Sequence, residues 1–189
     1  NQEISWSEII REKVHLKLPA LATINLIKNT SLSFFKLYFR FSSHGVKNVP
    51  EGPCILAPNH QSFFDGLFVA SFLKRKTMQK TYFFAKKKHV NTGFLRFLAN
   101  SNNVIVVDTN KDLKESIQKM AAVLKKGRKI IVFPEGTRTK DGALGEFKRT
   151  FAILSKELEV PVVPVVIDGA YRALPRGAVF PRPFARVRV

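Results

Sequence analysis

A histidine and an aspartate five residues apart, His60 and Asp65, are the first candidates for chemistry in this chain. Within one regular helix the two side chains would point about 140° apart and could not pair, because each residue turns the helix by about 100°. Ser62 precedes Asp65 by three residues, which is a capping-box spacing, so we expect the helix to begin at Ser62. His60 then lies in the preceding loop. There Asp65 can bind one ring nitrogen while the other nitrogen takes a proton from a hydroxyl.

The spacing alone favours a plainer alternative, in which Asp65 only caps the helix and His60 is an ordinary loop histidine. The other histidines, His15, His44 and His89, have no acid at a comparable spacing, so we interpret them as structural or exposed. No group of His, Asp or Glu has the spacing of a metal site. The single cysteine excludes an intrachain disulfide and a Cys-based zinc site. We therefore expect no bound metal.

A second candidate site is the turn Glu135-Gly136-Thr137-Arg138-Thr139, directly after an apolar run. The carboxyl end of a strand is where α/β sheets usually build ligand sites. Gly136 permits a tight turn, the two threonines supply hydroxyls, and the planar fork of Arg138 suits a phosphate. Glu135 could hold that arginine or accept a substrate hydroxyl. An ordinary exposed turn with a Glu–Arg pair is an equally good interpretation.

The chain is strongly basic, with 32 Lys and Arg against 14 Asp and Glu, a net charge of +18. Such an excess predicts an anionic partner, whether nucleic acid, an acidic membrane surface or a phosphorylated substrate. Eight basic residues and no acid lie from Lys74 to Arg96, and Lys86 is among them. A solvated charge run is the simplest interpretation, and a phosphate-binding patch is favoured if Lys86 lies near both candidate sites. Aromatic and basic residues also interleave over Tyr82–Lys88, so a non-catalytic module that binds nucleic acid or acidic lipid is an alternative.

The elements that position these residues alternate between strand and helix. Buried strands are predicted at Cys54–Ala57, Tyr82–Ala85, Val104–Val107, Lys129–Phe133 and Val162–Ile167. Helical patterns between them cover Phe63–Leu73, Lys111–Lys125 and Gly145–Leu158. This alternation predicts an α/β fold, with a mixed, largely parallel sheet flanked by helices, over residues 45–189. We expect the C-terminus of this domain to be incomplete, because Arg186–Val189 alternates like a strand cut short.

Residues 1–44 form a separate N-terminal amphipathic helical segment. The stretch from Leu18 to Phe41 is apolar but interrupted by lysine and arginine, and its longest uncharged run, Leu18 to Ile27, has 10 residues. A spanning helix needs roughly 20 apolar residues. We therefore expect this segment, with the basic run after Lys74, to hold the protein on a membrane surface without crossing it. A helix docked on the core of its own domain is an equally good interpretation.

Two of these motifs together carry a family resemblance. Asn59-His60-x4-Asp65, followed by Phe133-Pro134-Glu135-Gly136-Thr137-Arg138, resembles the first and third motifs of the glycerolipid acyltransferases. The 1-acyl-sn-glycerol-3-phosphate acyltransferase branch is the most similar. Val160–Val165 resembles the fourth motif, and the likeness covers roughly residues 45–189.

The resemblance implies a role for each matching residue. His60 would be the general base and Asp65 its support. Glu135, Gly136, Thr137 and Arg138 would bind the acceptor's phosphate with help from Lys86, and Pro164 would support the acyl chain or the structure.

The resemblance also implies the partners. The donor would be acyl-CoA or acyl carrier protein, and the acceptor would be a lysophospholipid. The protein would be peripheral or monotopic, bound to a membrane surface on the cytoplasmic face. We expect no bound cofactor and no nucleic acid. The second family motif usually ends in arginine, but Asp108-Thr109 stands here, which leaves other lysolipids and glycerol 3-phosphate open as acceptors. No Ser or Cys lies in a Gly-x-Ser-x-Gly elbow, so we expect direct transfer without an acyl-enzyme.

Overall fold

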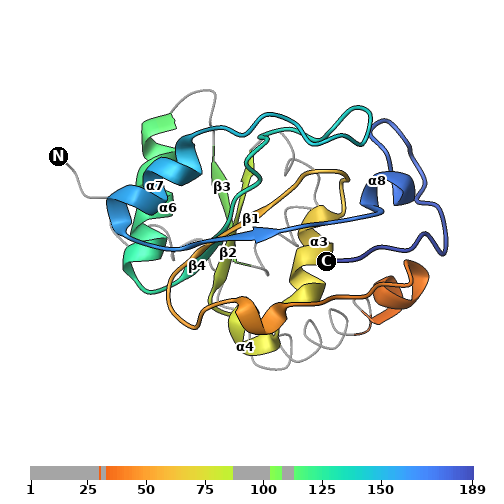
Figure 1. The fold of residues 1–189 in the computed structure, drawn as a ribbon, viewed down its shortest axis with the longest axis horizontal. Helices are drawn as coiled ribbons and strands as arrows, with labels where there is room; N and C mark the ends of the chain where they lie inside the picture. The colour runs from red at the N-terminus through yellow and green to blue at the C-terminus, as the bar shows by residue number, and fades with distance from the viewer. Residues whose placement is uncertain (1–29, 31–32, 87–102, 108–112) are drawn as a thin grey trace, which may run out of the picture.

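A five-stranded sheet forms the centre of the molecule in the computed structural model, which describes residues 30, 33–86, 103–107 and 113–189. The strand order is β3-β2-β4-β1-β5, and every pair of the described strands is parallel (Figure 1). The strands are β1 (Ile55–Pro58), β2 (Thr81–Lys86), β3 (Val104–Val107), β4 (Lys129–Ile131) and β5 (Val162–Val165). The predicted α/β fold and all five predicted strands are therefore confirmed.

Besides the helical residues 33–38, five helices among the described residues connect and flank the strands. They are α3 (Asp65–Phe72), α4 (Arg75–Met78), α6 (Leu113–Lys125), α7 (Thr150–Leu158) and α8 (Ala170–Ala173), and a short 3₁₀ turn, η1, covers Val46–Asn48. The predicted start of α7 at Gly145 was wrong, because the helix begins at Thr150. The N–H groups of Gly145 and Lys148 donate instead to Glu135 and to the carbonyl of Pro134, so residues 145–148 run along the Glu135 turn.

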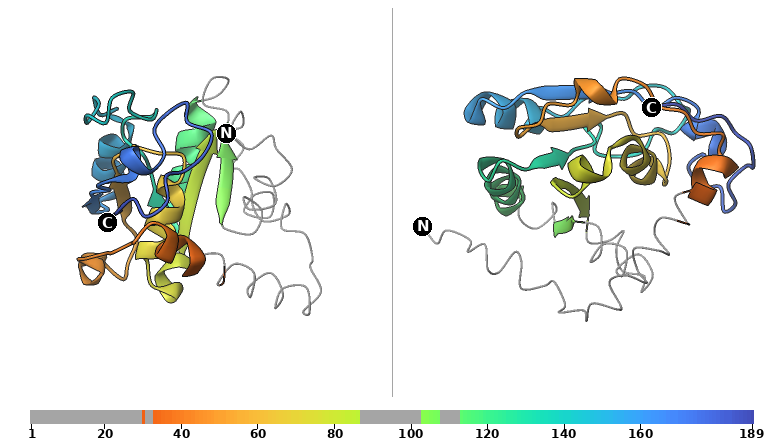
Figure 2. Two further views of the ribbon diagram at one scale, coloured as in Figure 1. Left: turned by 90° about the vertical axis from the view of Figure 1, so that its right-hand side faces the viewer. Right: turned by 90° about the horizontal axis from the view of Figure 1, so that it is seen from below.

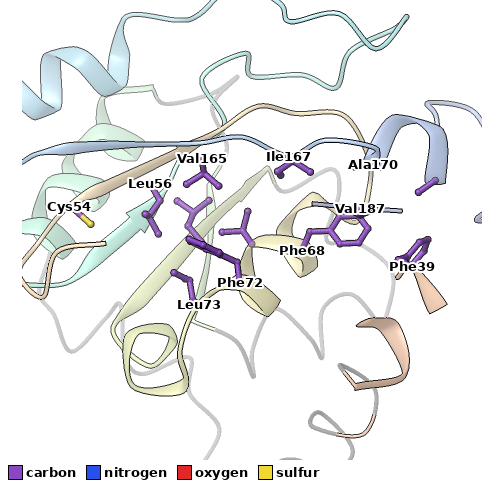
Figure 3. Close-up of a cluster of buried hydrophobic side chains, with 13 residues drawn as sticks. Phe39, Cys54, Leu56, Phe68, Phe72, Leu73, Val165, Ile167, Ala170 and Val187 are labelled. Atoms are coloured by element: carbon purple, nitrogen blue, oxygen red, sulfur yellow. The ribbon is translucent and has the colours of Figure 1, made fainter. Parts of the chain in front are cut away.

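Helices pack on both faces of the sheet, so the central strands β1 and β4 are buried on two sides. Successive strand residues point to opposite faces, and Ile55 and Leu56 of β1 accordingly enter different clusters. On one face, the cluster drawn in Figure 3 joins the sheet to α3 through Leu56, Ile131, Val165, Phe68, Val69 and Phe72. On the other face, α6 and α7 pack through Ile55, Ile130, Met120, Val123, Leu124 and Leu154. This two-sided burial explains why the strands appear in the sequence as continuous apolar runs.

The described end of the N-terminal segment, residues 33–44, packs on the domain. Phe39 is buried in the α3 cluster, and Ser42 donates its N–H to the carbonyl of Val187. Most of the predicted amphipathic run, from Leu18 to Phe41, lies outside the described residues. Within the described residues, no helix has the length and apolar character needed to cross a membrane.

Candidate active site

The two candidate motifs meet because β1 and β4 are neighbours in the sheet. Both strands are parallel, so the chain leaves them at the same edge, at Pro58 and Ile131. From β1 the chain continues through α3 to β2 on one side, whereas from β4 it continues through α7 to β5 on the other. A point where successive connections diverge, at the carboxyl ends of adjacent strands, is where open α/β sheets bind ligands.

His60 and Asp65 form the pair that their spacing predicts. Nδ1 of His60 lies 2.8 Å from Oδ2 of Asp65, and the imidazole ring stacks on Phe133 with ring centroids 4.2 Å apart. An ionised carboxylate only accepts hydrogen bonds, so Nδ1 carries the proton and Nε2 keeps its lone pair. The His60 side chain is 23% exposed, whereas Asp65 is fully buried. The hydrogen bond from Nδ1 to Asp65 thus fixes the orientation of the imidazole ring, and Nε2 can take a proton.

Asp65 also organises the backbone that carries the histidine. Its Oδ2 accepts the N–H groups of Gln61 and Ser62 at 2.6 and 2.8 Å. The predicted helix start at Ser62 was wrong, because α3 begins at Asp65, and residues 62–64 form a turn in front of it. Only half of the expected capping box is present: Asp65 accepts from Ser62, whereas the Ser62 hydroxyl accepts a long hydrogen bond from Phe64. Burial raises the pKa of Asp65, although its hydrogen bonds to His60, Ser62 and Gln61 oppose that shift.

Glu135 ties the second motif to the first. Its Oε1 accepts the backbone N–H of His60 at 2.6 Å, and its Oε2 accepts that of Gly145 at 2.9 Å. The carbonyl of His60 accepts the N–H of Thr139 at 2.8 Å, so residues 135 and 139 hold both backbone groups of the histidine. Glu135 is buried, and both of its oxygens are used. The prediction that Glu135 could hold Arg138 was wrong for this conformation, because both carboxylate oxygens of Glu135 accept backbone N–H groups instead.

This arrangement predicts a stability cost for truncating Glu135. In Glu135→Ala the N–H groups of His60, which is half-buried, and of Gly145, which is exposed, lose their acceptor. An unsatisfied buried donor costs about 1–3 kcal/mol, so the loss at His60 should dominate. We expect urea unfolding to show that loss, with a smaller one for Glu135→Gln, which keeps one acceptor oxygen. Glu146→Ala, in an exposed neighbour of Gly145, serves as the control and should unfold like the wild type. Equal stability of Glu135→Ala and Glu146→Ala would contradict the bridging role.

The rest of the second motif surrounds the histidine loop. Gly136 adopts a φ of 67°, as the predicted tight turn requires, and its N–H donates to the carbonyl of Phe133 at 3.0 Å. A Cβ at this position would meet the Lys148 side chain at 2.8 Å. Thr137 is exposed, and the guanidinium carbon of Arg138 lies 6.0 Å from the centre of the Phe63 ring. The motif thus places an arginine beside the residues that lead from His60 into α3.

Three further predicted residues differ in how they relate to this site. The hydroxyl of Thr139 donates to Asp141 and accepts from Gly142, so its predicted role in supplying a hydroxyl was wrong, and it stabilises the loop instead. Lys86 ends β2, at the same sheet edge as the other two motifs, and its side chain lies outside the described part of the structure. Pro164 pairs with Ala57 in the edge strand β5, where a missing N–H is tolerated, and its side chain is exposed.

Long-range contacts that the sequence did not predict position the histidine loop. The Asn59 amide joins the segments that follow β1 and β5, since it donates to the carbonyl of Ile167 at 3.0 Å and accepts that residue's N–H at 2.6 Å. The Gln61 side chain accepts the N–H of Tyr171, at the start of α8. In the sequence, these contacts were signalled only by the presence of two amide side chains, Asn59 and Gln61, on either side of His60. Among the described residues, no group of three or more His, Cys, Asp or Glu could hold a metal ion.

Comparisons with known proteins agree with these motifs. The model of a family described as acyltransferase matches residues 40–168. A chloroplastic 1-acyl-sn-glycerol-3-phosphate acyltransferase of Brassica napus is 30% identical over 78% of this chain, and one of Pseudomonas aeruginosa is 28% identical over 67%. The chain spans 42% and 48% of those two proteins, less than half of each. The crystal structure of the 1-acyl-sn-glycerophosphate acyltransferase PlsC of Thermotoga maritima superposes with a TM-score of 0.67 and 26% identity, covering 95% of this chain and 72% of that one.

Proposed function

Because this chain belongs to the acyltransferase family, we propose that it moves a fatty acyl group from a thioester to the free hydroxyl of a lysophospholipid. The first candidate acceptor is 1-acylglycerol 3-phosphate, which would give phosphatidic acid, since similar proteins from Brassica napus and Pseudomonas aeruginosa carry that acceptor in their names. The observation that carries the proposal is the 2.8 Å contact between His60 and the buried Asp65, next to the turn that contains Arg138.

Nε2 of His60 would act as the general base. It takes the proton of the acceptor hydroxyl while the oxygen attacks the thioester carbonyl and forms a C–O bond. The C–S bond of the tetrahedral intermediate then breaks, and the imidazolium returns the proton to the leaving thiolate. Asp65 balances the transient positive charge through Nδ1–H, which it already holds in place. The net reaction is an ester and a free thiol from an alcohol and a thioester.

Arg138 is the side chain proposed to bind the acceptor's phosphate, with Lys86 as a weaker contributor. A guanidinium offers two parallel N–H donors to a phosphate, whereas an ammonium acts as a point charge. Thr137, exposed in the same turn, would add a hydroxyl, and Gly136 would allow the backbone to approach. In this proposal Glu135 positions His60 and Gly145 and does not touch the phosphate.

Acyl-CoA and acyl carrier protein are both proposed as donors, because each is anionic and the chain carries a net charge of +18. We place the protein at a membrane surface as a peripheral or monotopic protein on the cytoplasmic face, since acceptor and product are lipids. No cofactor is needed for the steps above. The direct test is transfer of a radiolabelled acyl group from each donor to lysophosphatidate, other lysolipids and glycerol 3-phosphate. Absence of transfer to every acceptor would overturn the proposal.

Arg138→Ala is expected to act mainly on the acceptor. Losing a charge-assisted contact costs roughly 1.5–3 kcal/mol, so the KM for the acceptor should rise about tenfold to a hundredfold, while the KM for the thioester changes little. Arg138→Lys should retain part of the affinity, and Lys86→Ala should show a smaller rise. Initial rates at varied acceptor concentration measure this effect. Unchanged KM and kcat in Arg138→Ala would show that the phosphate binds elsewhere.

A further inference from the structure

A group of exposed apolar side chains lies at the end of the molecule that carries α8. Phe34 and Leu37, in helical residues 33–38, are 67% and 74% exposed, and Val179, Phe180 and Phe184, in the loop 174–186, are 80%, 83% and 59% exposed. We call these five side chains, with the basic residues between them, the aromatic–arginine surface. Single exposed apolar residues are ordinary, but a group of this kind marks an interaction site.

Specific contacts join the two segments of the aromatic–arginine surface. The Tyr38 hydroxyl donates to the carbonyl of Pro181 at 3.1 Å, and the N–H of Phe184 donates to the carbonyl of Tyr38 at 2.8 Å. The rings of Tyr38 and Phe184 stack at 6.4 Å, and the ring of Phe34 lies 5.8 Å from that of Tyr38. Figures 1 and 2 show the helical segment and the loop after α8 side by side. The surface is therefore one continuous feature built from both ends of the described chain.

The two segments that build this surface carry charge of a single sign. Residues 30–50 and 169–189 contain no Asp or Glu. The guanidinium carbon of Arg40 lies 5.4 Å from the centre of the Phe184 ring, so a positive charge sits directly on the apolar group. The other exposed lysines and arginines within residues 33–50 and 169–189 are Lys36, Lys47, Arg172, Arg176, Arg182, Arg186 and Arg188.

We infer that the aromatic–arginine surface docks on an anionic lipid bilayer, with Val179 and Phe180 inserted at the level of the headgroups. Apolar tips bordered by basic side chains are the combination that binds an acidic bilayer surface, because the chains bury apolar area while the cations meet phosphates. We call Val179 and Phe180 the tip of the loop. Arg176 precedes the tip and Arg182 follows it, so the cations lie beside the inserted residues. The absence of acidic residues from both segments removes the repulsion that a like-charged lipid surface would create.

The surface is connected to the histidine loop. The ring of Phe35, next to Phe34, lies 5.5 Å from the ring of Phe64, measured between centroids. In α8, which leads into the loop 174–186, the N–H of Tyr171 donates to the side chain of Gln61. Docking would therefore hold His60 close to the lipid surface from which an acceptor enters. This purpose rests on the proposed function, whereas binding to lipid can be measured without any catalysis.

The test uses point substitutions in the whole chain, because deleting residues 1–44 would also remove Phe39 from the core. The first variant, Val179→Ser with Phe180→Ser, removes the apolar tip, and the second, Arg176→Gln with Arg182→Gln, removes two charges. Leu113→Ser and Ile153→Ser are matched controls, since these residues are 53% and 57% exposed on α6 and α7, at the opposite end of the molecule (Figure 1). Flotation measures binding to phosphatidylcholine vesicles with and without phosphatidylglycerol.

We expect the wild type and both controls to bind phosphatidylglycerol vesicles strongly and pure phosphatidylcholine weakly. The apolar variant should bind at least about tenfold more weakly at any salt concentration. The charge variant should bind roughly 20- to 30-fold more weakly at low salt, about fivefold for each arginine, and the difference should shrink at high salt because salt screens the charges.

Wild-type binding in either loop variant, or equal losses in the controls, would overturn the inference. Self-association of the wild type would also overturn the inference if sedimentation showed that the apolar variant is monomeric. A second copy of the chain would then be what covers the surface. A short-chain, water-soluble acceptor separates this inference from the proposed function. Both loop variants should transfer acyl groups to it at the wild-type rate, and slow transfer should be confined to acceptors in vesicles. Vesicle binding as expected without transfer to any acceptor would refute the proposed function and leave the docking surface in place.

Discussion

Replacing His60 with alanine is expected to lower acyl transfer by about 10²–10⁴-fold while the protein stays folded. The loss follows from removing Nε2, the atom proposed to take the acceptor proton. The fold should survive because the bridging contacts of residue 60 come from its backbone: the N–H donates to Glu135 and the carbonyl accepts from Thr139. Only the ring contact with Phe133 and the bond to Asp65 are lost.

Single-turnover rates with saturating donor and acceptor measure this effect, and thermal unfolding checks the fold. The matched control is His44→Ala, which removes an exposed imidazole from the loop before η1 and should keep wild-type turnover. A folded His60→Ala protein with near-normal turnover would falsify the mechanism. Loss of activity in His44→Ala as well would point to a general sensitivity of the fold rather than to a base.

The second large effect is expected from Asp65→Asn, which should slow transfer about 10²–10³-fold. An asparagine oxygen can still accept the N–H groups of Gln61 and Ser62, so the loop should keep its shape. The negative charge that balances the imidazolium is removed, and in a buried pair such a charge interaction is stronger than in water. The variant should therefore lose kcat and keep its KM for the acceptor, in contrast to Arg138→Ala.

Stability provides an independent check on Asp65→Asn. Burial raises the pKa of Asp65 in the folded protein above its ordinary value of 3.8, so the folded state holds the proton more tightly than the unfolded chain. Stability then falls as the pH rises from 3.8 through the folded pKa, and at neutral pH the ionised carboxylate costs the fold free energy. The amide removes this cost because it carries no charge.

We therefore expect Asp65→Asn to be at least as stable as the wild type at neutral pH, with the two proteins converging below pH 3.8. Urea unfolding across this pH range measures the difference. A variant that is less stable at neutral pH, with a gap that closes on acidification, would mean that the ionised carboxylate stabilises the fold. Its hydrogen bonds to the loop would then outweigh its burial.

The sequence was a sufficient guide to features that depend on neighbouring residues. Apolar runs predicted all five described strands, because a strand buried on both faces appears in the sequence without interruption. The His60–Asp65 pair was also predictable, since only four residues separate its members and the turn in front of α3 brings them together. The boundaries of that helix and of α7 were wrong, because helix starts depend on which N–H groups find other acceptors.

What only the tertiary structure decided was how distant segments hold the site. Glu135 reaches the N–H of His60 across 75 residues, and Asn59 reaches Ile167 across 108. No local pattern encodes these contacts, because they depend on β4 and β5 both lying beside β1 in the sheet. The sequence left open whether the N-terminal segment docks on the core or on a membrane, and its described residues do the first through Phe39 while exposing Phe34 and Leu37. Periodicity reports which residues prefer burial, but only the packed chain determines which apolar side chains find a partner and which are left facing outward.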